Sequence, residues 1–140
     1  MAFVPPAPAL PGEALLEIFI YPDPAFAANR ALDESNKFSD TARLEYLGRK
    51  ATELVYMDLL RTRWPHSSAE QLQGMVDNGF NALLERAASA YQWSQRVHGY
   101  PVGFDRNSPQ ESRRLFCVYA GAVHVEYGYE RLKGWVAELR

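Results

Sequence analysis

Three observations predict an all-α fold for this chain of 140 residues. Apolar residues recur at helical spacing over most of its length, and serine-led capping sequences precede two of these stretches. No stretch of useful length alternates apolar and polar residues with the period of two that a strand needs. A chain of this length buries a core without disulfides or metals. We therefore expect one domain over residues 12–140, built from about six to seven helices, behind a proline-rich tail at residues 1–11.

The N-terminal part divides into a tail, a short helix and a loop. The tail (MAFVPPAPALP) is dense in proline and has no helical period, so we expect an extended segment, although such a stretch also resembles an SH3-type ligand. Glu13–Tyr21 is strongly apolar and predicts a buried helix that Pro22 and Pro24 end. Residues 21–37 contain turn formers without a period and predict a loop.

The longest predicted helix runs from Ser39, a suitable N-cap, to Trp64, where Pro65 stops it. Its middle is apolar on most of the circumference, so we expect this helix to pass through the centre of the domain.

Two capping boxes predict the helices of the second half. In Ser67–Glu70 and Ser108–Glu111, a serine and a glutamate three residues later are suited to satisfy each other's backbone groups. The segments predicted from these signals and from apolar spacing are a helix through Val76, further helical spacing over 80–91, a loop over 97–107, and helices over 108–128 and 132–139.

The charge balance and the cysteine count limit the function classes. The formal net charge is −2, from 15 Lys and Arg against 17 Asp and Glu, whereas proteins that bind nucleic acid usually carry a basic surplus or a basic face. One cysteine excludes an internal disulfide. No apolar run approaches the ~20 residues of a membrane span, and no signal or transit peptide is evident. We expect an intracellular protein in the nucleus, cytoplasm or mitochondrion, without a membrane partner.

Two separated motifs resemble the ribonuclease III family. TARLEYLGRK at residues 41–50 is similar to the family's signature helix, which usually reads close to NERLEFLGD. LFCVYAGAVHVEYG at residues 115–128 is similar to a second conserved helix, usually DxFEALIGAIYLDxG. The resemblance covers roughly residues 10–139 and is closest to small RNase III-like proteins of fungi. It implies the helical fold of the nuclease domain, with no double-stranded RNA-binding domain in this chain.

The resemblance also implies that the active site is degenerate. Active members hold Mg²⁺ with four carboxylates, two on each motif helix, at spacings that place each pair on one helix face. In this chain Glu45 remains, whereas Arg49, Arg114 and Cys117 stand where the other three carboxylates are expected. We therefore expect no metal site, no cofactor and no nuclease activity, with Mg²⁺ relevant only if residual cleavage exists.

Two interpretations of the altered pocket follow. In the first, Glu45, Arg49 and Arg114 form a structural ion cluster in place of the metal. In the second, Arg49, Lys50, Arg113 and Arg114 contact phosphates of double-stranded RNA, because the guanidinium fork suits phosphate oxygens.

The resemblance implies a dimer through the signature helix, with Tyr46 and Leu47 at the interface, either as a homodimer or as a heterodimer with an active homologue. The predicted function is a non-catalytic adaptor or protector of double-stranded RNA in RNA processing. One alternative is a structural or assembly protein, like the RNase III-like proteins of the mitochondrial large ribosomal subunit. A second is an active Mg²⁺-dependent endonuclease that recruits other carboxylates, such as Glu111 or Glu126.

Overall fold

The computed structural model describes residues 4–22 and 35–140. In these residues the elements are α1 (Gly12–Ile18), α3 (Thr41–Arg63), α4 (Ala69–Tyr91), the 3₁₀ helix η1 (Trp93–Arg96), α5 (Pro109–Tyr127) and α6 (Tyr129–Leu139). The described ranges contain no strand, only an isolated parallel bridge between Ile20 and His98. The predicted all-α fold is confirmed. The predicted helical stretches between residues 67 and 91 form one continuous helix, α4.

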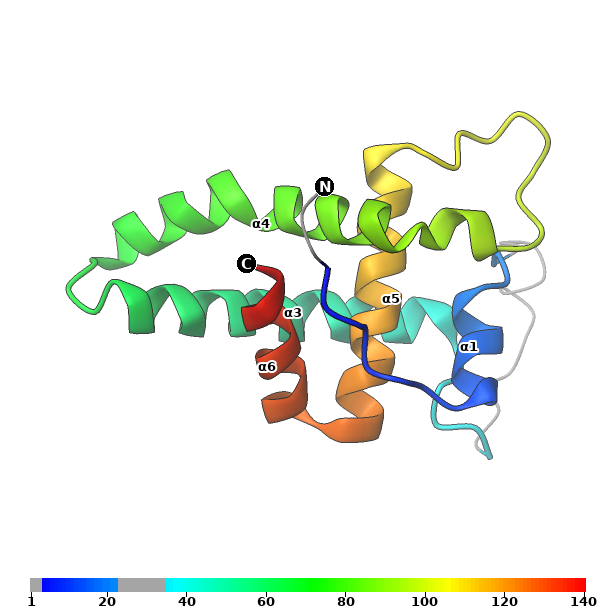
Figure 1. The fold of residues 1–140 in the computed structure, drawn as a ribbon, viewed down its shortest axis with the longest axis horizontal. Coiled ribbons are helices and arrows are strands. Elements are labelled where there is room, and N and C mark those ends of the chain that lie inside the picture. Colours follow the sequence, from blue (N-terminus) through cyan, green and yellow to red (C-terminus); the bar gives the residue numbers. More distant parts are fainter. Residues whose placement is uncertain (1–3, 23–34) are drawn as a thin grey trace.

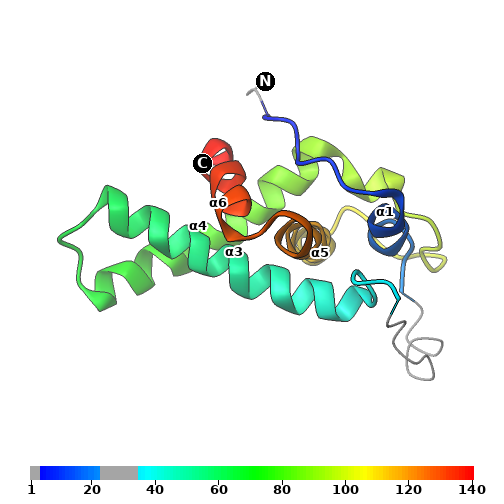
Figure 2. The same ribbon diagram turned by 90° about the horizontal axis from the view of Figure 1, so that it is seen from below.

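The two longest helices, α3 and α4, run antiparallel along the long axis of the molecule (Figure 1). α5 crosses this hairpin steeply, and α6 folds back beside α5 (Figures 1 and 2). α1 lies at the end of the molecule remote from the α3–α4 turn, and the segment before it passes across α5 (Figures 1 and 2). The helices therefore pack around α5.

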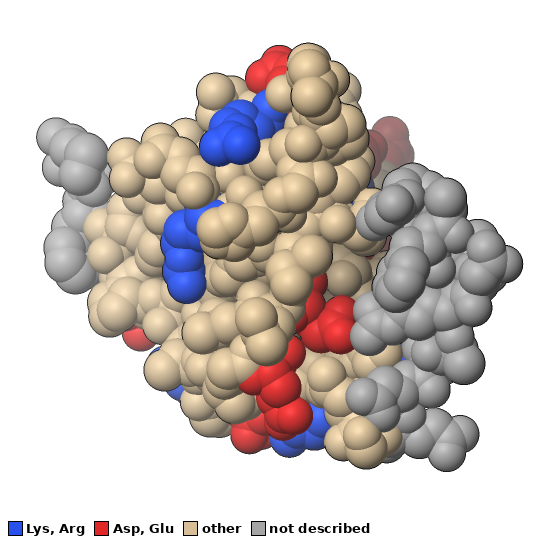
Figure 3. All heavy atoms as spheres, turned by 90° about the vertical axis from the view of Figure 1, so that its right-hand side faces the viewer, with Lys and Arg blue, Asp and Glu red and all other residues tan. Residues whose placement is uncertain are grey.

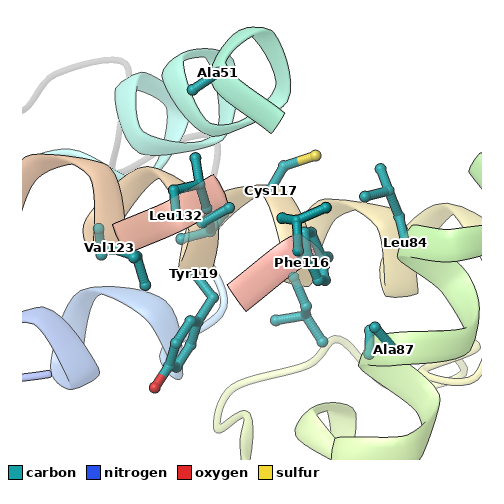
Figure 4. Packing of buried hydrophobic residues seen from close by; sticks show 14 of the residues in the cluster. Ala51, Leu84, Ala87, Phe116, Cys117, Tyr119, Val123 and Leu132 are labelled. Atoms are coloured by element: carbon teal, nitrogen blue, oxygen red, sulfur yellow. The ribbon is translucent and has the colours of Figure 1, made fainter. Parts of the chain in front are cut away.

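The central helix is α5, not α3 as predicted. Every residue from Leu115 to Val123 is buried, so this stretch faces the core on all sides (Figure 4). α3 instead keeps one face in solvent, where 71% of Tyr46 and 48% of Leu54 are exposed. The apolar side chains of α3 that suggested a central position are thus divided between the core and the surface.

α3 and α5 cross at a backbone-to-backbone contact made by two glycines. A Cβ atom at Gly48 would lie 1.8 Å from the carbonyl oxygen of Cys117, and one at Gly121 would lie 2.1 Å from the carbonyl oxygen of Leu44. Only glycine lets two helices approach so closely. This crossing determines how the side chains of the two motif helices face each other.

The caps of α3 and α4 lie one residue later than predicted. The N-cap of α3 is Asp40, whose carboxylate accepts a 2.9 Å hydrogen bond from the amide of Arg43, whereas Ser39 is buried. α4 begins with a complete capping box between Ser68 and Gln71, whereas the predicted box joined Ser67 and Glu70. Both signals were correct in type, because several adjacent residues in each segment carry a suitable oxygen.

α1 ends at Ile18, three residues before the predicted end. The backbone that follows pairs with His98: the His98 amide donates to the Phe19 carbonyl (2.8 Å), and the Tyr21 amide donates to the His98 carbonyl (2.7 Å). The predicted loop at 97–107 is confirmed, while most of the predicted loop at 21–37 lies outside the described residues. None of the helices described here is long and apolar enough to cross a membrane.

Candidate functional site

The four positions expected to carry metal ligands come together between α3 and α5. Glu45 and Arg49 lie one turn apart on α3, and Arg114 and Cys117 lie on the part of α5 that packs against it. The charges of Arg114 and Arg49 both act on the pKa of Glu45, and those of Arg49 and Glu45 act on the pKa of Cys117. These four positions therefore form one cluster between α3 and α5, which is called the pocket below.

A fifth residue belongs to this pocket: Glu111 of α5, which is only 3% exposed and whose charge acts on Glu45. Arg114 grips its carboxylate with two parallel hydrogen bonds, Nε to Oε1 and Nη2 to Oε2, each 2.7 Å long. The hydroxyl of Tyr100 donates a third hydrogen bond of 2.5 Å to Oε2. Bidentate pairing of this kind is among the strongest polar contacts in proteins.

The predicted ion cluster of Glu45, Arg49 and Arg114 is therefore replaced by a different pairing. Arg114 uses its fork on Glu111, three residues earlier on the same helix face. Within the described part of the chain, no salt bridge of 4.0 Å or less involves Glu45. Glu111 also departs from its predicted capping role: its amide donates to Ser108 Oγ (3.2 Å), but its side chain turns to Arg114.

An aromatic wall covers the Glu111–Arg114 pair from the loop side. The guanidinium of Arg114 lies 5.4 Å from the centre of the Tyr21 ring. Tyr21, Tyr100 and Phe104 pack on one another, with ring centres 5.0–5.2 Å apart. These rings exclude water from one side of the pair, which strengthens its electrostatic attraction.

The pKa shifts agree with a partly desolvated site. Burial raises the pKa of the Tyr100 hydroxyl, and its hydrogen bond to the Glu111 carboxylate raises it further. Burial acts to lower the pKa of Arg114, but the hydrogen bonds to Glu111 and the charges of Glu111, Tyr100 and Glu45 together outweigh it, so the guanidinium pKa rises. Burial also raises the pKa of Glu45 above its usual 4.5, against the opposing charge of Arg114. Glu45 is thus the less well compensated carboxylate of the pocket.

Two other arginines proposed as phosphate ligands also have partners within the chain. Arg49 Nη2 donates to Asn81 Oδ1 (3.3 Å), and its guanidinium lies over the ring of Phe80. Arg113 forms a 3.3 Å salt bridge with Glu85. With Arg114 included, three of the four proposed RNA-contacting residues thus bind other side chains of this chain.

The fourth candidate, Lys50, is exposed and shares a face of α3 with Tyr46, whose ring centre lies 5.9 Å from Lys50 Nζ. Beside Tyr46 is a groove of about 520 Å³. It is lined by Lys37, Ser39, Asp40, Ala42, Arg43, Leu44, Tyr46, Leu47 and Val125. Both predicted dimer residues, Tyr46 and Leu47, therefore lie at one accessible groove.

Cys117 is 1% exposed and belongs to the hydrophobic core (Figure 4). Burial raises the pKa of its thiol to about 11, although the charge of Arg49 acts in the opposite direction. The residue is thus a core side chain with a protonated thiol at neutral pH, as predicted from its position on the apolar helix face.

A metal-binding arrangement does not form among the described residues, where no three His, Cys, Asp or Glu side chains converge on a possible ion position. Glu126, one of the two alternative carboxylates, instead pairs with Lys37 at 3.1 Å. It lies fifteen residues from Glu111 on α5, or about 22 Å along a helix, so the two cannot share an ion. Glu45 and Glu111 are the two carboxylates of the pocket, and Glu111 has both oxygens bonded to cationic or hydroxyl donors.

Sequence reasoning missed the pairing of Glu111 with Arg114 and the contribution of Tyr100. The first had a detectable signal, because a glutamate and an arginine at i,i+3 share a helix face. Tyr100 had none, since it reaches the site from an irregular loop eleven residues earlier.

Charge on the surface near α1 is mixed. On the face of the molecule at the α1 end, Lys and Arg form separate patches and acidic side chains form a band (Figure 3). The described residues on this face therefore form no continuous basic area that would track a nucleic-acid backbone.

The crossing of α3 and α5 within an α3–α4 hairpin corresponds to the fold of the RNase III nuclease domain. Among solved structures, the chain is similar to the nuclease domain of ribonuclease III from Campylobacter jejuni, with a TM-score of 0.65 and 18% sequence identity over 90% of this chain and 83% of that one. That structure is described as showing flexibility in a region involved in dimer formation. No family model and no curated protein sequence matches the chain. The likeness establishes a shared fold.

Proposed function

We propose that this chain is a non-catalytic RNase III-like protein that acts as a dimer in RNA processing, binding double-stranded RNA without cleaving it. The main support is the bidentate Glu111–Arg114 pair, which lies where an active member would gather metal ligands. Mg²⁺ requires several oxygen ligands in near-octahedral geometry. A guanidinium in the same pocket repels the ion and already occupies a neighbouring carboxylate.

Cleavage of a long RNA duplex in the presence of Mg²⁺ tests the catalytic part of this proposal. We expect no products from the wild-type chain or from Glu45→Ala at equal concentration, because one free carboxylate cannot support metal-ion catalysis. Cleavage by the wild type that disappears in Glu45→Ala would identify an active site and refute the proposal. It would favour the alternative of a nuclease with a non-standard ligand set.

The dimer is proposed from the exposed ring of Tyr46 beside the groove that Leu47 helps to line. Sedimentation velocity at micromolar concentration should show a dimer for the wild type and a shift towards monomer for Tyr46→Ala. Leu16→Ala is the matched control, since Leu16 is 65% exposed but lies on α1. A wild type that sediments as a monomer would exclude the homodimer and leave the heterodimer with an active homologue.

RNA contact is proposed at Arg49, a half-buried member of the pocket, and at its exposed neighbour Lys50. Lys50 is exposed, and Arg49 can exchange its long 3.3 Å hydrogen bond to Asn81 for a stronger charge-assisted contact with phosphate. Arg49→Glu combined with Lys50→Glu should weaken duplex RNA binding and flatten its dependence on salt concentration. The same charge change at Arg131 and Lys133 of α6 serves as the control.

The alternative of a structural or assembly protein is favoured by one observation. Arg113 and Arg114 are both paired with glutamates of their own chain, so they are less available to phosphates. If the wild type is a dimer but binds duplex RNA negligibly at every salt concentration, this alternative is favoured over the RNA adaptor.

A further inference from the structure

The proline-rich N-terminal segment is held on the domain by tyrosine hydroxyls. We refer to residues 4–11 as the strap. Tyr119 donates a 2.6 Å hydrogen bond to the carbonyl of Pro8, and Tyr91 and Tyr127 donate to the carbonyls of Pro5 and Ala9. In Figures 1 and 2 the strap runs from α1 across α5 towards α4. The strap is thus seated on side chains of α4 and α5 that lie more than 80 residues away in sequence.

The strap has the pattern of a polyproline II ligand. Pro5 and Pro8 are buried, whereas Pro6 and Ala9 are exposed. A polyproline II helix has three residues per turn, so residues at i and i+3 fall on the same side. The sequence Pro5-Pro6-Ala7-Pro8 therefore presents a PxxP face to the domain.

The surface beneath the strap is aromatic. Trp93 is stacked against Tyr91 and Tyr119, with ring centres 4.7 and 4.4 Å apart and interplanar angles of 14° in both cases. The indole of Trp135 donates a 3.1 Å hydrogen bond to the Tyr91 hydroxyl, which in turn donates to Pro5. An aromatic surface that also carries hydroxyl donors for backbone carbonyls is the kind of site that recognises proline-rich segments in general.

From this arrangement we propose that the aromatic cluster of Tyr91, Trp93, Tyr119, Tyr127 and Trp135, whose tyrosines hold the strap, is a binding site for PxxP segments of partner proteins, and that the strap occupies it as an internal competitor. The inference is independent of the proposed RNA function. A ligand of the same chemistry takes the place of the strap by forming the same hydroxyl–carbonyl contacts.

The attachment of the strap determines how strongly a partner must bind. A tethered segment acts at an effective concentration of the order of millimolar. A free peptide equal to the strap therefore competes poorly with it, and a partner needs a longer or better matched proline-rich segment. The hydroxyl donors are available at neutral pH, because burial raises the pKa of Tyr119 to about 12 and raises that of Tyr91.

Tryptophan fluorescence of the full-length chain measures this competition. Pro5→Asp with Pro8→Asp releases the strap from the aromatic cluster and gives the opened variant. Trp64→Phe removes the emission of the exposed tryptophan at the α3–α4 turn. The probe is a synthetic peptide with the sequence of residues 1–11. We expect saturable binding to the opened variant at least tenfold tighter than to the wild type, and no binding of a peptide with glycine in place of both prolines.

The hydroxyls supply the specific part of the test. In the opened variant, Tyr119→Phe should weaken peptide binding about three- to tenfold, the range expected for one lost hydrogen bond. Equal binding of the glycine peptide, or equal affinity of the opened variant and the wild type, would overturn the proposal. If the opened variant loses its helical circular dichroism, the wild type is titrated to millimolar peptide instead. Saturation by the proline peptide alone then supports the proposal, and its absence refutes it.

Discussion

The glycine at the centre of the signature helix provides a sharp test of how α3 and α5 are packed. Gly48→Ala adds one methyl group, whose carbon would lie 1.8 Å from the Cys117 carbonyl oxygen and 2.5 Å from the Gly121 amide nitrogen. Both of these atoms belong to the backbone of α5. Neither can rotate away as a flexible side chain would.

The magnitude follows from the displacement that the methyl group requires. Ordinary van der Waals contact begins near 3.4 Å, so the helices must separate or slide by about 1.6 Å at their crossing. Overpacking in a dense core typically costs about 1–3 kcal/mol, occasionally more, and a clash against backbone belongs at the upper end. Alanine offsets about 1 kcal/mol of this through its higher helix propensity. We expect a net loss of about 2 kcal/mol or more in the free energy of unfolding.

Urea denaturation followed by circular dichroism measures this loss, with Gly74→Ala as the matched control. Gly74 also lies inside a long helix, but a Cβ atom there would have no neighbour within 4 Å. The control should gain up to about 1 kcal/mol from propensity alone. Opposite signs for the two variants support the backbone contact between α3 and α5. A Gly48→Ala variant as stable as Gly74→Ala would refute it.

Three further predictions concern the pocket. Arg114→Met leaves the buried Glu111 carboxylate without its bidentate partner and should reduce the free energy of unfolding by about 3–5 kcal/mol. Adding Glu111→Gln should restore part of this loss. A loss below about 1 kcal/mol in urea denaturation would contradict the pairing. Folding raises the pKa of Glu45 above 4.5, so between its unfolded and folded pKa values the folded state binds more protons than the unfolded state. The stability of the wild type therefore falls as the pH rises through this range. Glu45→Gln should therefore be the more stable protein at pH 7 but have no such advantage at pH 4, and the reverse order would show that its charge is well compensated. With a thiol pKa of about 11, Cys117 should be thiolate in about one molecule in a thousand at pH 8, so an Ellman reagent should react only on unfolding; immediate reaction of the native chain would place the sulfur at the surface.

Local signals were sufficient for the elements whose boundaries depend on nearby residues. Ser108 and Pro109 begin α5 where predicted, and the apolar spacing of residues 80–91 continues as the C-terminal half of α4. The end of α1 could not be read in this way, because the residues after Ile18 leave the helix to pair with His98, some 80 residues away. Similarly, the exposure of one face of α3 depends on how many neighbours the fold places around it.

The candidate site shows the same division. The expectation that carboxylates are missing at positions 49, 114 and 117 came from the resemblance of the two motifs to the ribonuclease III family. The partner of Arg114 could not be read from the sequence. Glu111 lies one turn away on the same helix, Glu45 was expected on the facing helix, and both are suitable anions. The crossing at Gly48 and the approach of Tyr100 decide between them.

The sequence by itself determined that the chain is helical and, to within about one residue, where most of its helices begin. These properties depend on side-chain chemistry and on residues within a turn or two of one another. Only the tertiary structure decided that Glu111 holds Arg114, that α5 is the central helix, and that tyrosine hydroxyls of α4 and α5 hold the strap. Such contacts join segments remote in sequence, so they depend on how closely the helices cross and on which side chains that crossing brings within hydrogen-bonding distance.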